Sequence, residues 1–311
     1  MNILGTTKVL GVIGHPVSHS LSPAMQNAAI RALGLDYVYV PFHVLPNDLE
    51  SAIRGIRALG IAGINVTIPH KERIIGYLDE ISDSAKRIGS VNTVINDGGR
   101  LRGETTDGPG FVRSAEAAWG KIDGGRVVVL GAGGSAKAVA YALADAGCEV
   151  VIANRTVDRA IELAEGLCAD FGAGRSRAVG PRGEELAREV SEAGMLVNTT
   201  SVGMHPDVDG IPLPPDLLHS GLRVYDLVYN PPETALVREA LARGARAMTG
   251  ISMLVYQGAI SFEMWTGAPA PIEVMAQQFS LGEHHVMLNS IQHPLCEEMD
   301  PESPESSSGS G

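Results

Sequence analysis

The stretch that decides the fold is Val127–Leu143, VVVLGAGGSAKAVAYAL, near the middle of the chain. A run of apolar residues typical of a buried strand leads into a glycine-rich turn, and an alanine-rich helix is expected after it. The turn has the spacing GxGxxA, the dinucleotide-binding fingerprint with alanine in its third position. A purely structural turn gives the same letters, but the strand before it and the helix after it favour nucleotide binding. The expected cofactor-binding residues are Gly131, Ala132, Gly133, Gly134, Ser135 and Ala136.

Each residue type in this turn has a physical role. Gly131 permits the tight turn, and Gly133 lacks a Cβ, so that a pyrophosphate can approach the backbone. Ala136 is small enough for the helix to pack closely on the strand. The phosphates would lie at the helix N-terminus, where free N–H groups and the helix dipole favour anions.

The next expected strand, Glu149–Ala153, indicates which dinucleotide binds. NAD enzymes usually place an acidic residue at the end of this strand to bind the ribose 2′-hydroxyl. This chain instead continues with Asn154, Arg155 and Thr156, and Arg159 follows. Arginine is the natural partner of a 2′-phosphate, so the sequence favours NADP(H) over NAD(H). The alternative is a basic turn that is merely solvated.

The composition is that of an ordinary globular α/β protein. The chain has 311 residues, of which 44% are apolar and 19% charged, and its net charge is −12. The acidic balance disfavours a nucleic-acid or anionic-membrane surface. We expect no transmembrane helix and no signal peptide. The widely spaced Cys148, Cys168 and Cys296 form no CxxC pair, which fits a reducing cytoplasm.

Strands and helices alternate along the chain, which predicts an α/β fold with a mostly parallel sheet. A strand at 9–13 is followed by a helix that begins at Ser22 as N-cap with Pro23 at N1. Strands are expected at 37–44 and 61–68, and a hairpin turns at 97–99. A break at 120–126, GKIDGGR, separates this series from the nucleotide-binding series.

The C-terminal 29 residues differ in composition from the rest. Residues 283–311 contain six acidic residues and no Lys or Arg, and they end in DPESPESSSGSG. Such a segment cannot bury a core, so we expect a disordered acidic tail. The spacing of His284, His285, His293 and Cys296 matches no common zinc pattern, and we predict no metal site.

Polar residues gather where the expected strands of the first half end. Ser20 and Ser22 follow the first strand, and Lys71 follows the strand that contains Asn65 and Thr67. Taken singly, each polar residue reads as a helix cap, a turn residue or a loop charge. In open α/β sheets, however, ligands bind at this edge. The group also includes Asn92, Thr106 and Asp107. Together these polar residues suit a small, polyhydroxylated, anionic substrate.

At this point the sequence resembles the shikimate dehydrogenase family. The resemblance runs in order from about residue 8 to 281. It is carried by HSLSP, NVTIPHK, VNT, TDGPGF, GAGGSAKAV, NRT, NTTSVGM, YNPPET and MLVYQGAISFEMWTG. Nine linked motifs are far more specific than the dinucleotide turn alone.

The resemblance implies a two-domain enzyme with a cleft between its domains. The substrate-binding domain would be 1–106, completed by helices at 250–282, and the Rossmann NADP-binding domain would be 107–249. The implied reaction is the reversible NADPH-dependent reduction of 3-dehydroshikimate to shikimate, on the pathway to chorismate and the aromatic amino acids. The protein would be a cytoplasmic monomer or homodimer.

The family's functional residues map onto this sequence motif by motif. The catalytic pair maps onto Lys71 and Asp107; protonated Lys71 would donate to the developing alkoxide while Asp107 holds its ammonium. Substrate contacts map onto Ser20, Ser22, Asn65, Thr67, Asn92, Tyr229 and Gln257. Further cofactor contacts map onto Thr200, Ser201, Val202, Met204, Leu227, Gly250 and Met253.

Two departures from the family and several alternatives remain. Thr105 stands where the family often has Asn, and Lys137 stands where it often has Arg, so that pyrophosphate would meet a point charge rather than a fork. His70 is treated as a surface residue.

The nearest alternative function is that of a quinate/shikimate or aminoshikimate dehydrogenase. The arginines after the strand at 149–153 and the paired serines argue against NAD-linked quinate oxidation. A nucleotide-sensing regulator without catalysis and a methylene-tetrahydrofolate dehydrogenase explain fewer of the motifs.

Overall fold

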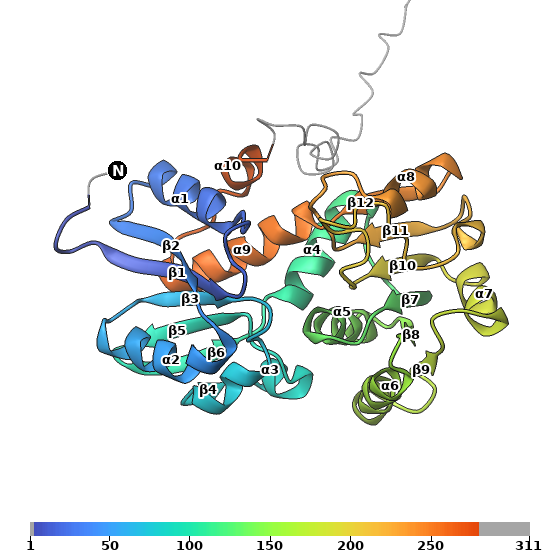
Figure 1. The fold of residues 1–311 in the computed structure, drawn as a ribbon, viewed down its shortest axis with the longest axis horizontal. Helices are drawn as coiled ribbons and strands as arrows, with labels where there is room; N and C mark the ends of the chain where they lie inside the picture. Colours follow the sequence, from blue (N-terminus) through green and yellow to red (C-terminus); the bar gives the residue numbers. More distant parts are fainter. Residues whose placement is uncertain (1–2, 280–311) are drawn as a thin grey trace, which may run out of the picture.

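The chain forms two six-stranded sheets joined by two long helices, α4 (Asp107–Trp119) and α9 (Ile251–Thr266) (Figure 1). The computed structural model describes residues 3–279. The predicted tail, with its histidines and Cys296, lies outside the described residues. The expected two-domain α/β fold is confirmed. Within residues 3–279, no helix is long and apolar enough to cross a membrane.

The first sheet is mixed and has the strand order β2-β1-β3-β5-β6-β4. Its central strand β1 pairs in parallel with both β2 and β3, whereas β5 is antiparallel to β3 and β6. The expected hairpin is confirmed between β5 and β6, where Gly98 and Gly99 take positive φ values of 59° and 97°. The strands are β1 (Lys8–Gly14), β2 (Tyr37–His43), β3 (Gly63–Val66), β4 (Glu80–Ile81), β5 (Thr93–Asp97) and β6 (Arg100–Glu104).

Helices cover both faces of this sheet because alternate strand residues point to opposite sides. Leu10 and Val12 of β1 pack with α1 (Ser22–Ala32), α9 and α10 (Ile272–Gln277). Ile13 of β1 and Ile64 of β3 pack on the other side, against α2 (Leu49–Ala58) and the 3-10 turn at Arg73–Tyr77. A short helix, α3 (Asp83–Ile88), follows β4.

The second sheet is entirely parallel and has the order β12-β11-β10-β7-β8-β9. Chain order therefore reverses between β7 and β10, which is the switch point at which Rossmann sheets bind nucleotides. The strands are β7 (Arg126–Leu130), β8 (Glu149–Ala153), β9 (Ser176–Val179), β10 (Met195–Asn198), β11 (Arg223–Asp226) and β12 (Arg246–Thr249).

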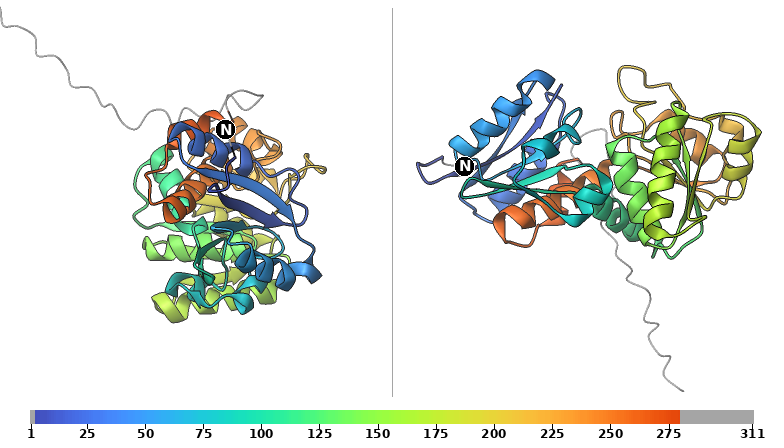
Figure 2. Two further views of the ribbon diagram at one scale, coloured as in Figure 1. Left: turned by 90° about the vertical axis from the view of Figure 1, so that its left-hand side faces the viewer. Right: turned by 90° about the horizontal axis from the view of Figure 1, so that it is seen from below.

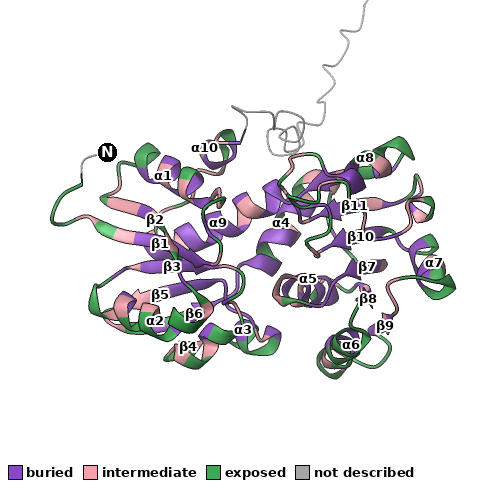
Figure 3. Ribbon diagram, viewed as in Figure 1, coloured by how far each residue is buried: buried purple, intermediate pink, exposed green. Residues whose placement is uncertain are grey.

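Two layers of helices enclose the second sheet. α4, α5 (Gly134–Asp145) and α6 (Val157–Phe171) share one buried cluster with it. α7 (Glu184–Ser191) and α8 (Ala235–Ala242) pack on the opposite face. Figure 2 shows α4 and α9 between the two sheets, and Figure 3 shows that both helices are largely buried.

Glycine allows α4 and α9 to touch. A Cβ at Gly110 would lie 2.6 Å from Gln257 Cβ and 2.7 Å from Gln257 N. A residue with a side chain at this position would therefore push apart the two helices that join the domains. The contact fixes Asp107, in the first turn of α4, relative to Gln257 of α9.

Several details differ from the sequence-based expectations. Ser22 and Asp107 were each expected to cap a helix, but each is the first residue of its helix, and the N-cap residues are Leu21 and Thr106. Thr234 does cap α8, because its hydroxyl accepts from Val237 N. The elements β9, α7, β12 and α3 were not expected at all.

Candidate active site

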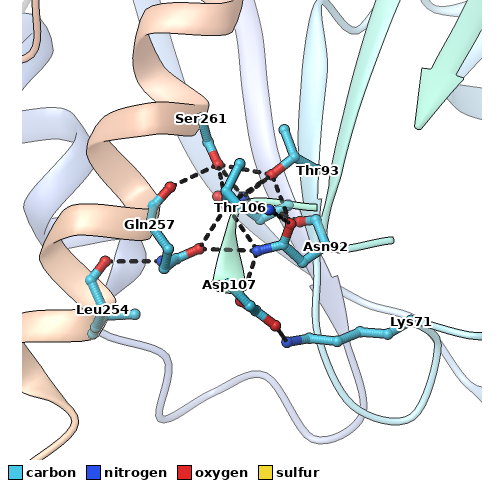
Figure 4. A network of polar contacts seen from close by, with 9 residues as sticks. Lys71, Asn92, Thr93, Thr106, Asp107, Leu254, Gln257 and Ser261 are labelled. Atoms are coloured by element: carbon cyan, nitrogen blue, oxygen red, sulfur yellow. Dashed lines mark hydrogen bonds and ion pairs between the residues drawn. The ribbon is translucent and has the colours of Figure 1, made fainter. Parts of the chain in front are cut away.

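The structure brings Lys71 and Asp107 into direct contact. Lys71 follows the end of β3, and Asp107 opens α4. Lys71 Nζ lies 2.5 Å from Asp107 Oδ2, and the two side chains are only 15% and 7% exposed (Figure 4). A backbone hydrogen bond of 2.9 Å from Val91 N to Lys71 O fixes the lysine segment beside the strands. The pair combines a proton donor with a partner that holds it in place.

Asn92 fixes the other half of Asp107. Its amide nitrogen donates to Asp107 Oδ1 at 2.7 Å, and its amide oxygen accepts from the backbone N of Thr106 at 2.7 Å. Gln257 Oε1 also accepts from Asn92 at 3.3 Å, and Gln257 Nε2 donates to Leu254 O at 2.8 Å (Figure 4). Both carboxylate oxygens of Asp107 thus accept hydrogen bonds from the protein.

The expected substrate residues of the first domain lie at the ends of β1 and β3. Ser22 is buried and its backbone N donates to Ser20 Oγ at 3.4 Å. Asn65 is also buried, and its amide donates to Asn92 O, Thr93 Oγ1 and Ser261 Oγ at 3.2, 3.3 and 3.1 Å. Thr67 packs on the end of β1, because a Cβ at Gly14 would lie 2.4 Å from its methyl group.

Tyr229, the expected substrate residue after β11, is half-buried against the cluster of α1 and α9, and burial raises its pKa.

The glycine turn has the shape that a dinucleotide requires. Gly131 has φ +114°, and a Cβ there would lie 2.4 Å from Thr199 Oγ1 at the end of β10. A Cβ at Gly133 would meet no atom within 4 Å, so its backbone borders open space. Ala136 is fully buried in the first turn of α5. The turn therefore fits a pyrophosphate at the switch point between β7 and β10.

The glycine turn also faces the lysine segment of the other domain. A Cβ at Gly134 would lie 3.0 Å from Ser90 Oγ and 3.8 Å from both Cβ and Cδ of Lys71. Lys137, expected near the pyrophosphate, has its Nζ 3.3 Å from Glu72 Oε1, next to Lys71. The proposed phosphate turn and the lysine–aspartate pair thus belong to one site.

The remaining expected cofactor residues lie on the same edge of the second sheet. Arg155, Thr156 and Arg159 are exposed beyond β8, and Asn154 Nδ2 donates to Thr156 O at 2.8 Å. Beyond β10, Asn198 Oδ1 accepts from Thr200 N at 3.0 Å. Gly250 touches the segment after β11, since a Cβ there would lie 2.1 Å from Leu227 O. Ser201, Val202 and Met204 are exposed, whereas Met253 is buried.

A buried carboxylate near these loops was not anticipated. Asp226 is fully buried at the end of β11 and accepts hydrogen bonds from Asn198 Nδ2, Val228 N and Thr234 Oγ1 at 2.8, 3.1 and 2.6 Å. Burial raises its pKa to about 6, against the lowering effect of these donors. It joins the loop after β10 to the loop after β11.

The expectation that His70 is a surface residue was wrong. Its side chain is 0% exposed, and Nε2 donates to Val44 O at 2.8 Å. Burial lowers the pKa of the ring. It ties the loop after β3 to the loop after β2, directly before Lys71.

Two other polar residues of the site were also missed. Ser261 lies four residues after Gln257, on the same face of α9, a spacing that could have identified it. Tyr39, by contrast, lies among apolar residues of β2 and carries no comparable signal.

A Rossmann sheet whose glycine turn faces a lysine–aspartate pair at the junction with a second domain defines a dinucleotide-dependent oxidoreductase. Comparison with family models then gives three matches. Residues 12–94 match the shikimate dehydrogenase substrate binding domain, 113–176 match shikimate / quinate 5-dehydrogenase, and 250–278 match the shikimate 5'-dehydrogenase C-terminal domain.

Individual relatives agree with these matches. A shikimate dehydrogenase (NADP(+)) of Methanopyrus kandleri is 53% identical over 87% of this chain and 94% of its own length. A shikimate dehydrogenase crystallised with NADP+ is 42% identical with a TM-score of 0.85, covering 89% of this chain and 96% of the other. The Thermus thermophilus enzyme, in complex with NADP(H) and shikimate, is 40% identical with a TM-score of 0.80 over 87% and 98% of the two chains. The chain belongs to the NADP-dependent shikimate dehydrogenase family.

Proposed function

We propose that this protein catalyses the reversible NADPH-dependent reduction of 3-dehydroshikimate to shikimate. The observation that carries the proposal is the contact between Lys71 and Asp107, 2.5 Å apart, directly beside the glycine turn. Proton donation to a ketone oxygen requires a positioned donor next to the bound dinucleotide. The two features meet here, although Lys71 and the glycine turn come from different domains.

Lys71 acts as the proton donor in the reduction. Bound NADPH supplies a hydride to the ketone carbon of the substrate. The Lys71 ammonium stabilises the oxygen on which charge develops and gives it a proton, leaving a neutral amine that solvent reprotonates. In the oxidation of shikimate the neutral amine takes the hydroxyl proton.

Asp107 keeps the ammonium aimed at the substrate. Its Oδ2 accepts from Lys71, and its Oδ1 is fixed by Asn92 at 2.7 Å, so the carboxylate cannot rotate freely. Holding a catalytic group in the reactive geometry lowers the entropic part of the activation barrier. Asp107 and Asn92 also offer oxygen atoms to the hydroxyl groups of the substrate.

The substrate is held by hydroxyl and amide groups. We assign the carboxylate of shikimate to Ser20 and Ser22, which lie together where α1 begins. The ring hydroxyls are assigned to Asn65 of β3, Asn92 directly before β5 and Gln257 of α9, which the polar network joins. Thr67, directly after β3, is a further hydroxyl contact, and Tyr229 closes the site on the cofactor side.

The cofactor is NADP(H), bound across the edge of the second sheet. The glycine turn 131–136 would hold the pyrophosphate, and Arg155 with Arg159 would pair with the 2′-phosphate. The nicotinamide would lie near the loops after β10 and β11, which contain Thr200, Ser201, Val202, Met204 and Leu227, and near Gly250 and Met253. In this assignment 1–106 with 250–282 form the substrate domain, and 107–249 form the NADP domain.

One assay separates this function from quinate dehydrogenase activity. The oxidation of NADPH and of NADH is followed with 3-dehydroshikimate and with 3-dehydroquinate as substrates. We expect kcat/KM to be highest for NADPH with 3-dehydroshikimate. Faster turnover of NADH with 3-dehydroquinate would contradict the proposal and identify a quinate dehydrogenase.

A further inference from the structure

Tyr39 supports one of the proposed substrate residues from behind. Its side chain is 1% exposed, and its hydroxyl lies 2.7 Å from Asn65 Oδ1. Tyr39 belongs to β2 and Asn65 to β3, which lie on either side of β1, so the contact joins two strands that do not pair with each other.

The backbone of Tyr39 is itself held rigidly. β2 is an edge strand of the first sheet. Asn27 of α1 donates to Tyr39 O at 2.7 Å and accepts from Tyr39 N at 3.0 Å. One amide side chain thus satisfies both outward-facing backbone groups of Tyr39. The phenol therefore projects from a fixed point toward Asn65.

The hydrogen bonds around Tyr39 run in one direction. Asn65 Nδ2 faces the carbonyl oxygen of Asn92 at 3.2 Å, which can only accept. The amide oxygen of Asn65 must therefore face Tyr39, and the phenol must donate to it. Tyr39 therefore fixes which side of the Asn65 amide the substrate meets.

We propose that Tyr39 is a positioning residue for substrate binding. It fixes the orientation of the Asn65 amide without touching the substrate. The inference rests on the proposed function, because it assumes that Asn65 binds a hydroxyl of shikimate. Asp107 is held directly by Lys71 and Asn92, and Asn65 reaches Asn92 only through its backbone oxygen, so loss of the Tyr39 hydroxyl should act mainly on substrate binding.

Tyr39→Phe removes only the hydroxyl and tests this role. Loss of the hydrogen bond to Asn65 should raise KM for shikimate about tenfold, with kcat and KM for NADP+ close to the wild-type values. Tyr37→Phe is the matched control, because Tyr37 lies on the same strand and its hydroxyl donates to Trp265 O at 3.5 Å, away from the substrate residues. We expect normal KM for shikimate in this control.

The outcomes are distinct. A normal KM for shikimate in Tyr39→Phe, in an enzyme that oxidises shikimate, would overturn this inference alone. Equal losses in kcat and in both KM values, together with a lower Tm, would show a general structural role and would also overturn it. Failure of the wild-type enzyme to oxidise shikimate would overturn the proposed function and the inference with it.

Discussion

The buried carboxylate of Asp226 should make the stability of the protein depend on pH in an unusual direction. Burial raises its pKa in the folded protein to about 6, from an ordinary value of 3.8. The folded state therefore binds a proton more readily than the unfolded state. This group adds stability as pH falls from above its folded pKa, and that contribution is lost as pH rises through about 6.

The size of the effect follows from the two pKa values. Complete protonation would favour folding by about 3 kcal/mol, since each pKa unit corresponds to about 1.4 kcal/mol. Between about pH 8 and about pH 5, only part of this is gained, about 1.4 kcal/mol. Two factors oppose each other at Asp226, since burial disfavours the charge while three hydrogen-bond donors favour it.

Urea unfolding of the wild type and of Asp226→Asn at several pH values isolates this group. The asparagine does not titrate, so all other carboxylates cancel when the two free energies of unfolding are subtracted. We expect the free energy of unfolding of the wild type, relative to that of the variant, to rise by about 1.4 kcal/mol as the pH falls from about 8 to about 5. A difference that stays flat, or that falls with acid, would show that the three donors outweigh burial and would refute the reasoning.

Two further predictions concern the helix contact and the cofactor. Gly110→Ala should lower stability by about 1–3 kcal/mol and reduce kcat/KM, because the new Cβ meets the backbone of Gln257 at 2.7 Å. Thermal unfolding measures this loss of stability. Gly55→Ala is the control, because a Cβ at Gly55 in α2 meets open space and should be neutral or slightly stabilising. Equal stability of the two variants would contradict the packing argument. Replacing Arg155 and Arg159 by Ala should raise KM for NADPH at least tenfold and leave KM for NADH nearly unchanged. Equal effects on KM for NADPH and on KM for NADH would contradict the assignment of Arg155 and Arg159 to the 2′-phosphate.

The elements that the sequence predicts well are those with a complete local signal. β7, the glycine turn and α5 form one continuous pattern, and the β5–β6 hairpin has its glycines at the turn. The four-residue strands β9 and β12 were missed because SRAV and RAMT are too short and too polar to show a period. Their strand structure depends on pairing with β8 and β11.

Residues whose partners are distant in sequence were the hardest to interpret. Asp107 has the side chain of a helix cap, but Lys71 binds it instead. His70 was assigned to the surface because it is polar, yet Val44 O satisfies its ring nitrogen in the interior. Asp226 gave no signal as a buried group, since Asn198 lies on another strand and Thr234 lies eight residues away. Only the tertiary structure brings such partners together.

The central claim is that Lys71 supplies the proton in a shikimate dehydrogenase reaction. Steady-state kinetics of Lys71→Ala, measured with NADPH and 3-dehydroshikimate, tests it most directly, with Ser20→Ala as the matched binding variant. We predict that Lys71→Ala lowers kcat by about 10²-fold or more, whereas Ser20→Ala mainly raises KM. A Lys71→Ala enzyme with near-normal kcat would contradict the account.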